Sequence, residues 1–275
     1  MAIEHNYLVN GNFNQAISPF DRGFAYGDGV FRTIKVVNGV PQHWPQHYQK
    51  LVADCAAIGI VCPSAELLMS DFLQLFTIDM YSSEVAVAKI IITRGESERG
   101  YAPPAITMPM RVMLKTAMRR YAESNYSEGV SLHVCETKLA MQPKLAGIKH
   151  LNRLENVMAR MEWQDDIHFD GLMLDQQNNV VECTMSNIFA RFNDRLVTPD
   201  LSQCGVAGIT RQSIIGLAAP LNLNIEIAQL SLDRLTAADE VIICNSMYGA
   251  FQVRNILNTS WAQQPLAKKI RSLLL

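Results

Sequence analysis

The sequence predicts a globular protein of mixed α and β structure in two parts. Strand-like runs with Asn-Gly turns alternate along the chain with helices that carry apolar stripes, and a polar stretch over residues 119–128 interrupts them. The 275 residues, 49% of them hydrophobic, can bury a sizeable core. We therefore expect an N-terminal α+β domain over residues 1–118, a linker over 119–128 and a C-terminal α/β domain over 129–275.

Turn and cap residues indicate the elements of the first part. The Asn-Gly pairs at residues 10–11 and 38–39 favour the positive φ angles of tight hairpin turns, so each predicts two paired strands. Pro45 suits the first turn of one helix, and Ser64 suits the cap of the next. Further strands are expected over residues 84–93 and 108–115, and a glycine-rich loop over residues 21–29.

The second part mixes short strands and helices without a repeating βαβ period. The expected elements are a strand over residues 130–135, a helix near 152–163, a hairpin over 172–181, a strand over 187–191, a helix over 210–219 and a strand over 240–244.

Composition and spacing exclude several classes of function. With 24 basic and 26 acidic residues, the chain has no field that would attract nucleic acid. The N-terminus lacks the pattern of a secretory signal, and no apolar run approaches a membrane span, so we expect a cytoplasmic protein. The six cysteines include no C-x-x-C pair, and the His43–His47 pair is interrupted by Pro45, so we expect no metal site.

Lys149 is the first residue that could carry chemistry. Its neighbours over residues 145–152 are mostly apolar or neutral. A lysine in such surroundings has a lowered pKa, which keeps part of the amine neutral and nucleophilic, as Schiff-base chemistry requires. The alternative is a side chain that extends from a strand end to water.

Glu182 is an acid inside a strand-like run, residues 180–184. Charged residues are seldom buried without a partner, so Glu182 lies either on an exposed face or inside against a cation. The residue type alone favours the exposed face. If the side chain is inside, a protonated pyridine nitrogen is one possible partner.

Two loops could bind a ligand. The glycines at 205 and 208 precede a predicted helix whose first amides could hold a phosphate, although a plain loop capped by Thr210 explains them nearly as well. Asn245 and Ser246 follow a strand, where a ligand crevice and a simple turn are both compatible with the sequence.

Together these elements resemble the fold-type IV pyridoxal-phosphate enzymes, which include branched-chain and D-amino-acid aminotransferases and aminodeoxychorismate lyase. The resemblance runs from about residue 21 to 253 and is strongest to the lyase branch. It rests on Arg22 and on residues 26–33 (YGDGVFRT), 93–101 (TRGESERGY) and 146–155 (AGIKHLNRLE), followed in order by Glu182, residues 208–211 and residues 244–245.

The resemblance implies a two-domain fold like that of D-amino-acid aminotransferase, a homodimer, and a pyridoxal 5'-phosphate site carried mostly by the C-terminal domain. It makes Lys149 the Schiff-base lysine and acid/base group. The phosphate would be held by the amides of Ile209 and Thr210 and the Ser246 hydroxyl, the ring nitrogen by Glu182, and the substrate by Tyr26, Arg99 and Asn245. Thr33 would be a catalytic residue, whose hydroxyl touches the substrate or relays a proton. The sequence is equally compatible with Thr33 as a strand residue that has no role in the reaction. Arg99 could likewise be a solvent-exposed arginine that does not contact the substrate.

One position departs from the family. Three residues after His47 the family usually has an arginine that clamps the phosphate, and this chain has Lys50. A lysine supplies the charge but not the bidentate fork.

The expected function is conversion of 4-amino-4-deoxychorismate to 4-aminobenzoate and pyruvate in folate biosynthesis. The alternatives are an aminotransferase of the same fold and a cofactor-free binding protein that has kept it.

Overall fold

The computed structural model describes residues 6–76 and 84–274. The chain divides into two compact units, of which the first comprises Met1–Arg119 and Ile148–Asn152 and the second Arg120–Gly147 and Arg153–Leu275. Within the described ranges, no helix is long and apolar enough to cross a membrane. The chain combines helices with two sheets, which confirms the mixed α and β class.

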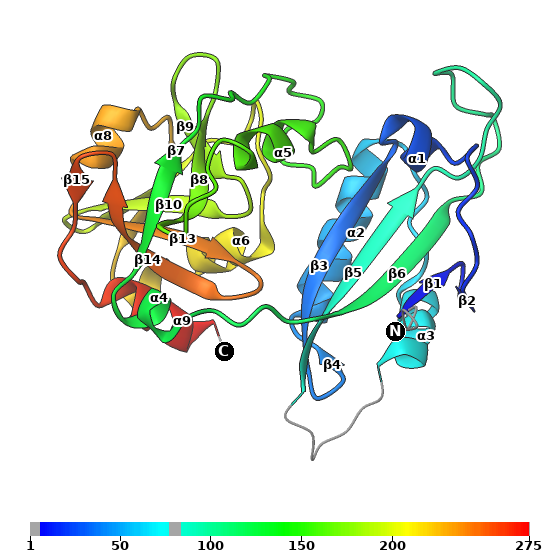
Figure 1. Ribbon diagram of the computed structural model, residues 1–275, viewed down its shortest axis with the longest axis horizontal. Coiled ribbons are helices and arrows are strands. Elements are labelled where there is room, and N and C mark those ends of the chain that lie inside the picture. Colours follow the sequence, from blue (N-terminus) through cyan, green and yellow to red (C-terminus); the bar gives the residue numbers. More distant parts are fainter. Residues whose placement is uncertain (1–5, 77–83, 275) are drawn as a thin grey trace. The chain divides into compact units, whose positions relative to one another are not determined.

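The first unit is built on an antiparallel sheet with the strand order β2-β1-β6-β5-β3-β4 (Figure 1). Its strands are β1 (Tyr7–Val9), β2 (Asn12–Phe13), β3 (Gly29–Val37), β4 (Val40–Pro41), β5 (Val85–Thr93) and β6 (Met110–Ala117), and its helices are α1 (Arg22–Tyr26), α2 (Trp44–Ala57) and α3 (Ala65–Leu75).

Local sequence signals account for most of this unit. The two Asn-Gly pairs have the positive φ angles expected of them, with Asn10 at 51° and Asn38 at 53°, and they join β1 to β2 and β3 to β4. The Ser64 hydroxyl caps α3 by accepting the Leu67 N–H at 3.2 Å. The apolar stripes of α2 and α3 pack with one face of β3 and β5 in a single core, whose buried members include Leu51, Cys55, Phe72, Val30, Ile34 and Ile90.

The glycine-rich segment is not entirely loop, so that expectation was wrong over Arg22–Tyr26. This stretch forms α1 because Asp21 caps it, accepting the Phe24 N–H at 3.0 Å. Gly27 ends the helix with a φ of 68°, a conformation that glycine adopts without strain.

The second unit contains a nine-stranded sheet with the order β12-β11-β10-β13-β14-β7-β8-β9 and β15 paired to β14. Its strands are β7 (Val130–Val134), β8 (His168–Leu174), β9 (Val180–Cys183), β10 (Asn187–Phe192), β11 (Arg195–Pro199), β12 (Asn224–Ala228), β13 (Glu240–Asn245), β14 (Gly249–Ile256) and β15 (Thr259–Ser260). Its helices are α4 (Glu123–Ser127), α5 (Leu154–Arg160), α6 (Ile209–Gly216), α7 (Ala218–Leu221), α8 (Leu232–Thr236) and α9 (Leu266–Leu273).

Two apolar clusters hold this sheet between helices. One includes Val130, Leu172, Ile188 and Phe251, and the other places Ile214 of α6 and Ile270 of α9 against strand residues. The short helix α4 lies within residues 119–128, where the sequence suggested only a linker.

Candidate active site

The segment carrying Lys149 is bound to the edge of β3 in the first unit. The Phe31 N–H donates to the Lys149 carbonyl at 3.0 Å, and the Leu151 N–H donates to the Gly29 carbonyl at 2.9 Å. The Lys149 side chain is half-buried, and its Nζ lies 4.7 Å from the centre of the Phe31 ring. The backbone of Lys149 is therefore fixed by main-chain hydrogen bonds, and its amine lies within cation–π distance of the Phe31 ring.

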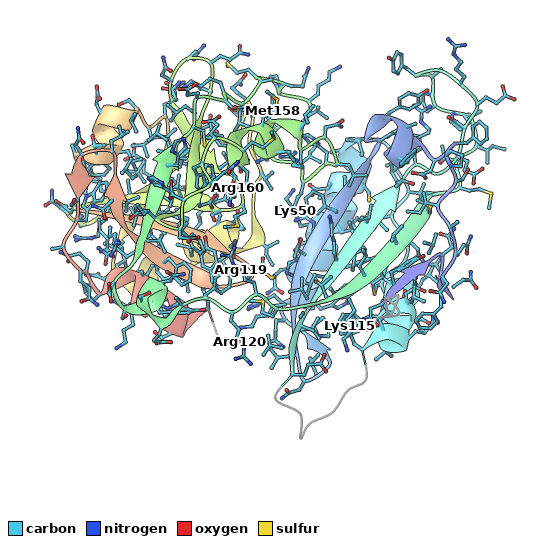
Figure 2. All side chains as sticks on the ribbon, viewed as in Figure 1. Lys50, Lys115, Arg119, Arg120, Met158 and Arg160 are labelled. Atoms are coloured by element: carbon cyan, nitrogen blue, oxygen red, sulfur yellow. The ribbon has the colours of Figure 1, made fainter. Side chains whose placement is uncertain are left out.

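Asp54 on α2 binds three donors around this segment. It accepts the Lys149 N–H at 3.2 Å and forms ion pairs with Arg32 and Lys50, the latter extending from α2 (Figure 2). Arg32 and Asp54 are each only 2% exposed. Neither residue was among the predicted site residues, although Arg32 alternates with core residues of β3 and Asp54 lies four residues after Lys50.

Burial and neighbouring cations shift the titration of this cluster. Desolvation, with smaller contributions from Arg32 and Lys149, lowers the pKa of Lys50 to about 7. Desolvation also lowers the pKa of His47 to about 3, so His47 stays neutral at pH 7. Such a cluster favours binding of an anion, because an added negative charge would offset the repulsion among the cations.

Thr33 lies on the open face of the same sheet, two residues after Phe31 on the same side of β3. It pairs with Lys89 in the register of β5, and the Lys89 Nζ lies 5.0 Å from the Phe31 ring centre. Thr33 is thus near the ring that Lys149 contacts, as a residue that faces the substrate would be.

Tyr26 and the loop that carries Arg99 are joined at one end of this unit. The Gly100 N–H donates to the Tyr26 hydroxyl at 3.3 Å, and the Tyr26 and Tyr101 rings are 5.4 Å apart. Arg22 holds the same loop by donating to the Tyr101 carbonyl at 2.8 Å. Arg99 itself is exposed.

Glu182 lies inside the second unit, 4% exposed, so the exposed position that its residue type favours was wrong. Its Oε2 accepts the Val206 N–H at 2.9 Å. The backbone donor offsets part of the cost of burying a carboxylate, and a cationic partner would offset more of it.

A buried acid fixes the turn that follows Glu182. Asp170 accepts hydrogen bonds from the Thr184 hydroxyl at 2.5 Å and the Ser186 hydroxyl at 2.6 Å. Ser186 also contacts the Tyr248 hydroxyl at 2.5 Å. The end of β9 is therefore tied to the core of the unit, an arrangement that the sequence did not reveal.

The loop before α6 presents a helix N-terminus. The Gly208 N–H donates to the Asn187 Oδ1 at 3.1 Å, and a Cβ at position 208 would lie only 2.4 Å from that oxygen, which explains the glycine. The helix begins at Ile209 rather than being capped by Thr210. The amides of Ile209 and Thr210 thus belong to the first turn, which has no intrahelical acceptors, and the Thr210 hydroxyl is 3.4 Å from that of Ser246.

Asn245 shapes a turn. Its Oδ1 accepts the N–H groups of Met247 and Tyr248, and its amide donates to the Met185 carbonyl at 3.3 Å. In the part of the chain that the structure describes, no cluster of three or more histidine, cysteine or acidic side chains could hold a metal ion.

The chain belongs to the class IV aminotransferase family, whose model matches residues 29–256. Members of this family depend on pyridoxal phosphate, and this chain is a pyridoxal-phosphate-dependent enzyme with the fold of the fold-type IV group.

Its relatives include lyases and aminotransferases. It is 35% identical to an aminodeoxychorismate lyase from Vibrio harveyi over 91% of each chain. The crystal structure of 4-amino-4-deoxychorismate lyase from Pseudomonas aeruginosa is 40% identical and superposes with a TM-score of 0.91, covering 98% of this chain and 97% of that one. A D-alanine aminotransferase from Bacillus licheniformis is 28% identical over 97% of this chain and 95% of its own length.

The residues present fit the cofactor. In the described part of the first unit, the Arg32 Nε and the His47 Nδ1 are buried without a hydrogen-bond partner, close to an excess of cationic groups. Orphaned buried polar atoms of this kind indicate a missing polar ligand. The second unit offers a buried carboxylate and a helix N-terminus, which match a protonated pyridine and a phosphate.

Proposed function

We propose that this enzyme is an aminodeoxychorismate lyase that converts 4-amino-4-deoxychorismate to 4-aminobenzoate and pyruvate. The buried Glu182 carboxylate, held by the Val206 amide, is the observation that supports its chemistry most strongly. The lyase relatives, similar over nine-tenths or more of the chain, support the choice of substrate.

Lys149 is the Schiff-base lysine and the acid/base group in this proposal. Pyridoxal phosphate, when bound, supplies an aldehyde for amines and a ring that accepts electrons. The backbone of Lys149 is held by the Phe31 N–H and by Asp54, and its Nζ would take the aldehyde and, when released, would accept the proton of the substrate carbon beside the amino nitrogen. Glu182 would hold the proton on the pyridine nitrogen.

The other proposed roles concern binding. The amides of Ile209 and Thr210, the Ser246 hydroxyl and the ammonium of Lys50 would hold the phosphate. Tyr26, Thr33, Arg99 and Asn245 would contact the substrate, with Thr33 also relaying a proton.

The lyase reaction needs no second substrate. A ring C–H proton leaves, its bonding electrons form the new ring double bond, and the C–O bond to the enolpyruvyl group breaks. A proton added to the released enolpyruvate gives pyruvate, so the two products contain all atoms of the substrate. Transamination, in contrast, passes nitrogen to a keto acid. We therefore expect the purified chain to form 4-aminobenzoate, detected by its fluorescence, and an equal amount of pyruvate when it is mixed with aminodeoxychorismate alone.

In the same assay, Lys149→Ala should form neither product. Its control is Lys144→Ala, which removes an exposed lysine from the loop before Lys149 and should leave turnover unchanged. If product forms only after a keto acid is added, or if D-alanine and 2-oxoglutarate react while aminodeoxychorismate does not, the chain is an aminotransferase and the lyase proposal fails.

We also propose that the enzyme is a cytoplasmic homodimer. Large apolar side chains are exposed on α1 and on loops of the first unit, including Phe20, Phe24, Tyr101, Ile106 and Met108, and exposed apolar surface is typical of subunit contacts. Light scattering should give twice the mass of one chain, and a monomer mass at micromolar concentration would contradict the dimer.

A further inference from the structure

A buried arginine occupies the core side of β3. Arg32 alternates with Val30 and Ile34, which are fully buried among apolar side chains, yet its guanidinium is charged and only 2% exposed. Burial of a charge is costly unless an opposite charge lies nearby. Asp54 supplies that charge by binding the Arg32 Nη2.

Asp54 also serves two groups that the proposed function uses. One carboxylate oxygen pairs with Lys50, and the other accepts the backbone N–H of Lys149 as well as Arg32. The carboxylate therefore orients the proposed phosphate lysine and the backbone of the Schiff-base lysine at the same time.

A carboxylate at this position disfavours the binding of an anion. A carboxylate paired with Lys50 alone would cancel the charge that the lysine offers to a phosphate, and at short range it would repel the phosphate. Arg32 removes this difficulty, because its guanidinium neutralises Asp54 from the core side. The excess positive charge of Arg32 and Lys50 over Asp54 then remains for a ligand.

We propose that Arg32 and Asp54 are positioning residues of the cofactor site: Asp54 orients Lys50 and the Lys149 backbone, and Arg32 neutralises Asp54 so that the carboxylate does not cancel the positive charge that the cluster offers to the phosphate. This pair compensates for the lysine that stands where the family usually has an arginine. The inference rests on the proposed assignment of Lys50 to the phosphate.

The test compares pyridoxal 5'-phosphate with pyridoxal, which lacks the phosphate. Dissociation constants of both are measured by absorbance and fluorescence titration of the full chain freed of cofactor. A role confined to stability would weaken the binding of both ligands alike, whereas a role in the net charge of the cluster changes the preference for the phosphorylated one.

We expect Arg32→Gln to raise the dissociation constant of pyridoxal 5'-phosphate roughly tenfold or more, as for loss of a charge-assisted contact. The dissociation constant of pyridoxal should change little. The double variant Arg32→Gln/Asp54→Asn should restore the preference to within roughly threefold of the parent, because the competing carboxylate is gone. Lys35→Gln, in the same strand but on its other face, is the matched control and should change nothing.

Unchanged preference in Arg32→Gln, or a loss that the double variant does not restore, would overturn the inference; the latter would mean that Arg32 binds the phosphate itself. If Arg32→Gln does not fold, Asp54→Asn decides. The asparagine oxygen can still accept a hydrogen bond at this position while the negative charge is gone, so the preference should increase, and no increase would overturn the inference. Lys50→Gln tests the assignment of Lys50 separately from the role of Arg32 and Asp54. An unchanged preference in this variant would mean that Lys50 does not bind the phosphate.

Discussion

The backbone N–H of Val206 lies 2.9 Å from the Glu182 carboxylate and donates to it. A residue at the end of β9 and a residue of the loop before α6 are thereby joined in the second unit. The same loop leads into the helix start proposed to bind phosphate. One hydrogen bond thus connects the proposed ring-nitrogen partner with the proposed phosphate loop.

We expect Glu182→Gln to retain the cofactor but to lose turnover by orders of magnitude. The amide can still accept the Val206 N–H, but it cannot hold the proton on the pyridine nitrogen. The cofactor content and kcat of the purified variant should be measured together. Turnover near that of the parent would refute the role of Glu182.

Local signals in the sequence predicted much of the fold. The Asn-Gly turns, the Ser64 cap and the strands β5 and β6 depend on neighbouring residues, and the structure confirms them. The family resemblance could be recognised because its motifs are short and ordered along the chain. The match of the family model to residues 29–256 confirms it.

Local sequence signals could not predict contacts between residues that are far apart in the sequence. Arg32 and Asp54 are 22 residues apart on a strand and a helix, and although Arg32 lies within the motif of residues 26–33, nothing in that motif indicates its pairing with Asp54. The parallel pairing of β11 with β12, and the Asp170 network after β9, likewise depend on the tertiary fold. The burial of Glu182 was missed for the same reason, since its partner Val206 comes 24 residues later.

Thr33→Val tests whether the Thr33 hydroxyl takes part in the reaction. Valine has nearly the same shape and suits a strand, so the sheet should persist while kcat falls about tenfold or more through loss of a proton relay or substrate contact. Steady-state kinetics with aminodeoxychorismate measure this effect. Kinetic constants equal to those of the parent would make Thr33 a plain strand residue.

Arg99→Ala tests the proposed contact with a substrate carboxylate. Loss of a charge-assisted hydrogen bond should raise KM roughly tenfold with little change in the unfolding temperature, because Arg99 is exposed. Arg119→Ala, also exposed, is the matched control. An Arg99 variant with the same KM as this control would dismiss the contact.

His47 should make the cofactor-free protein sensitive to acid. Its pKa is lowered to about 3 in the folded chain, whereas in the unfolded chain it is near 6.5, so the unfolded state binds more protons between these values. The free energy of unfolding therefore falls as the pH falls through this window, by roughly 5 kcal/mol at most from this group.

The measurement is urea unfolding of the parent and of His47→Gln from pH 7 down to about pH 4.5. The variant should lose less stability over this range, because glutamine does not titrate. Parallel pH profiles for the two proteins would show that His47 does not contribute.

Borohydride reduction tests whether Lys149 carries the cofactor. Reduction of the purified enzyme should abolish the imine absorbance and fix one pyridoxyl group on Lys149, located by peptide mass mapping. Lys149→Ala should show neither the absorbance nor the label, and its turnover should be lost. A label on another lysine, or imine absorbance that persists in Lys149→Ala, would contradict the account.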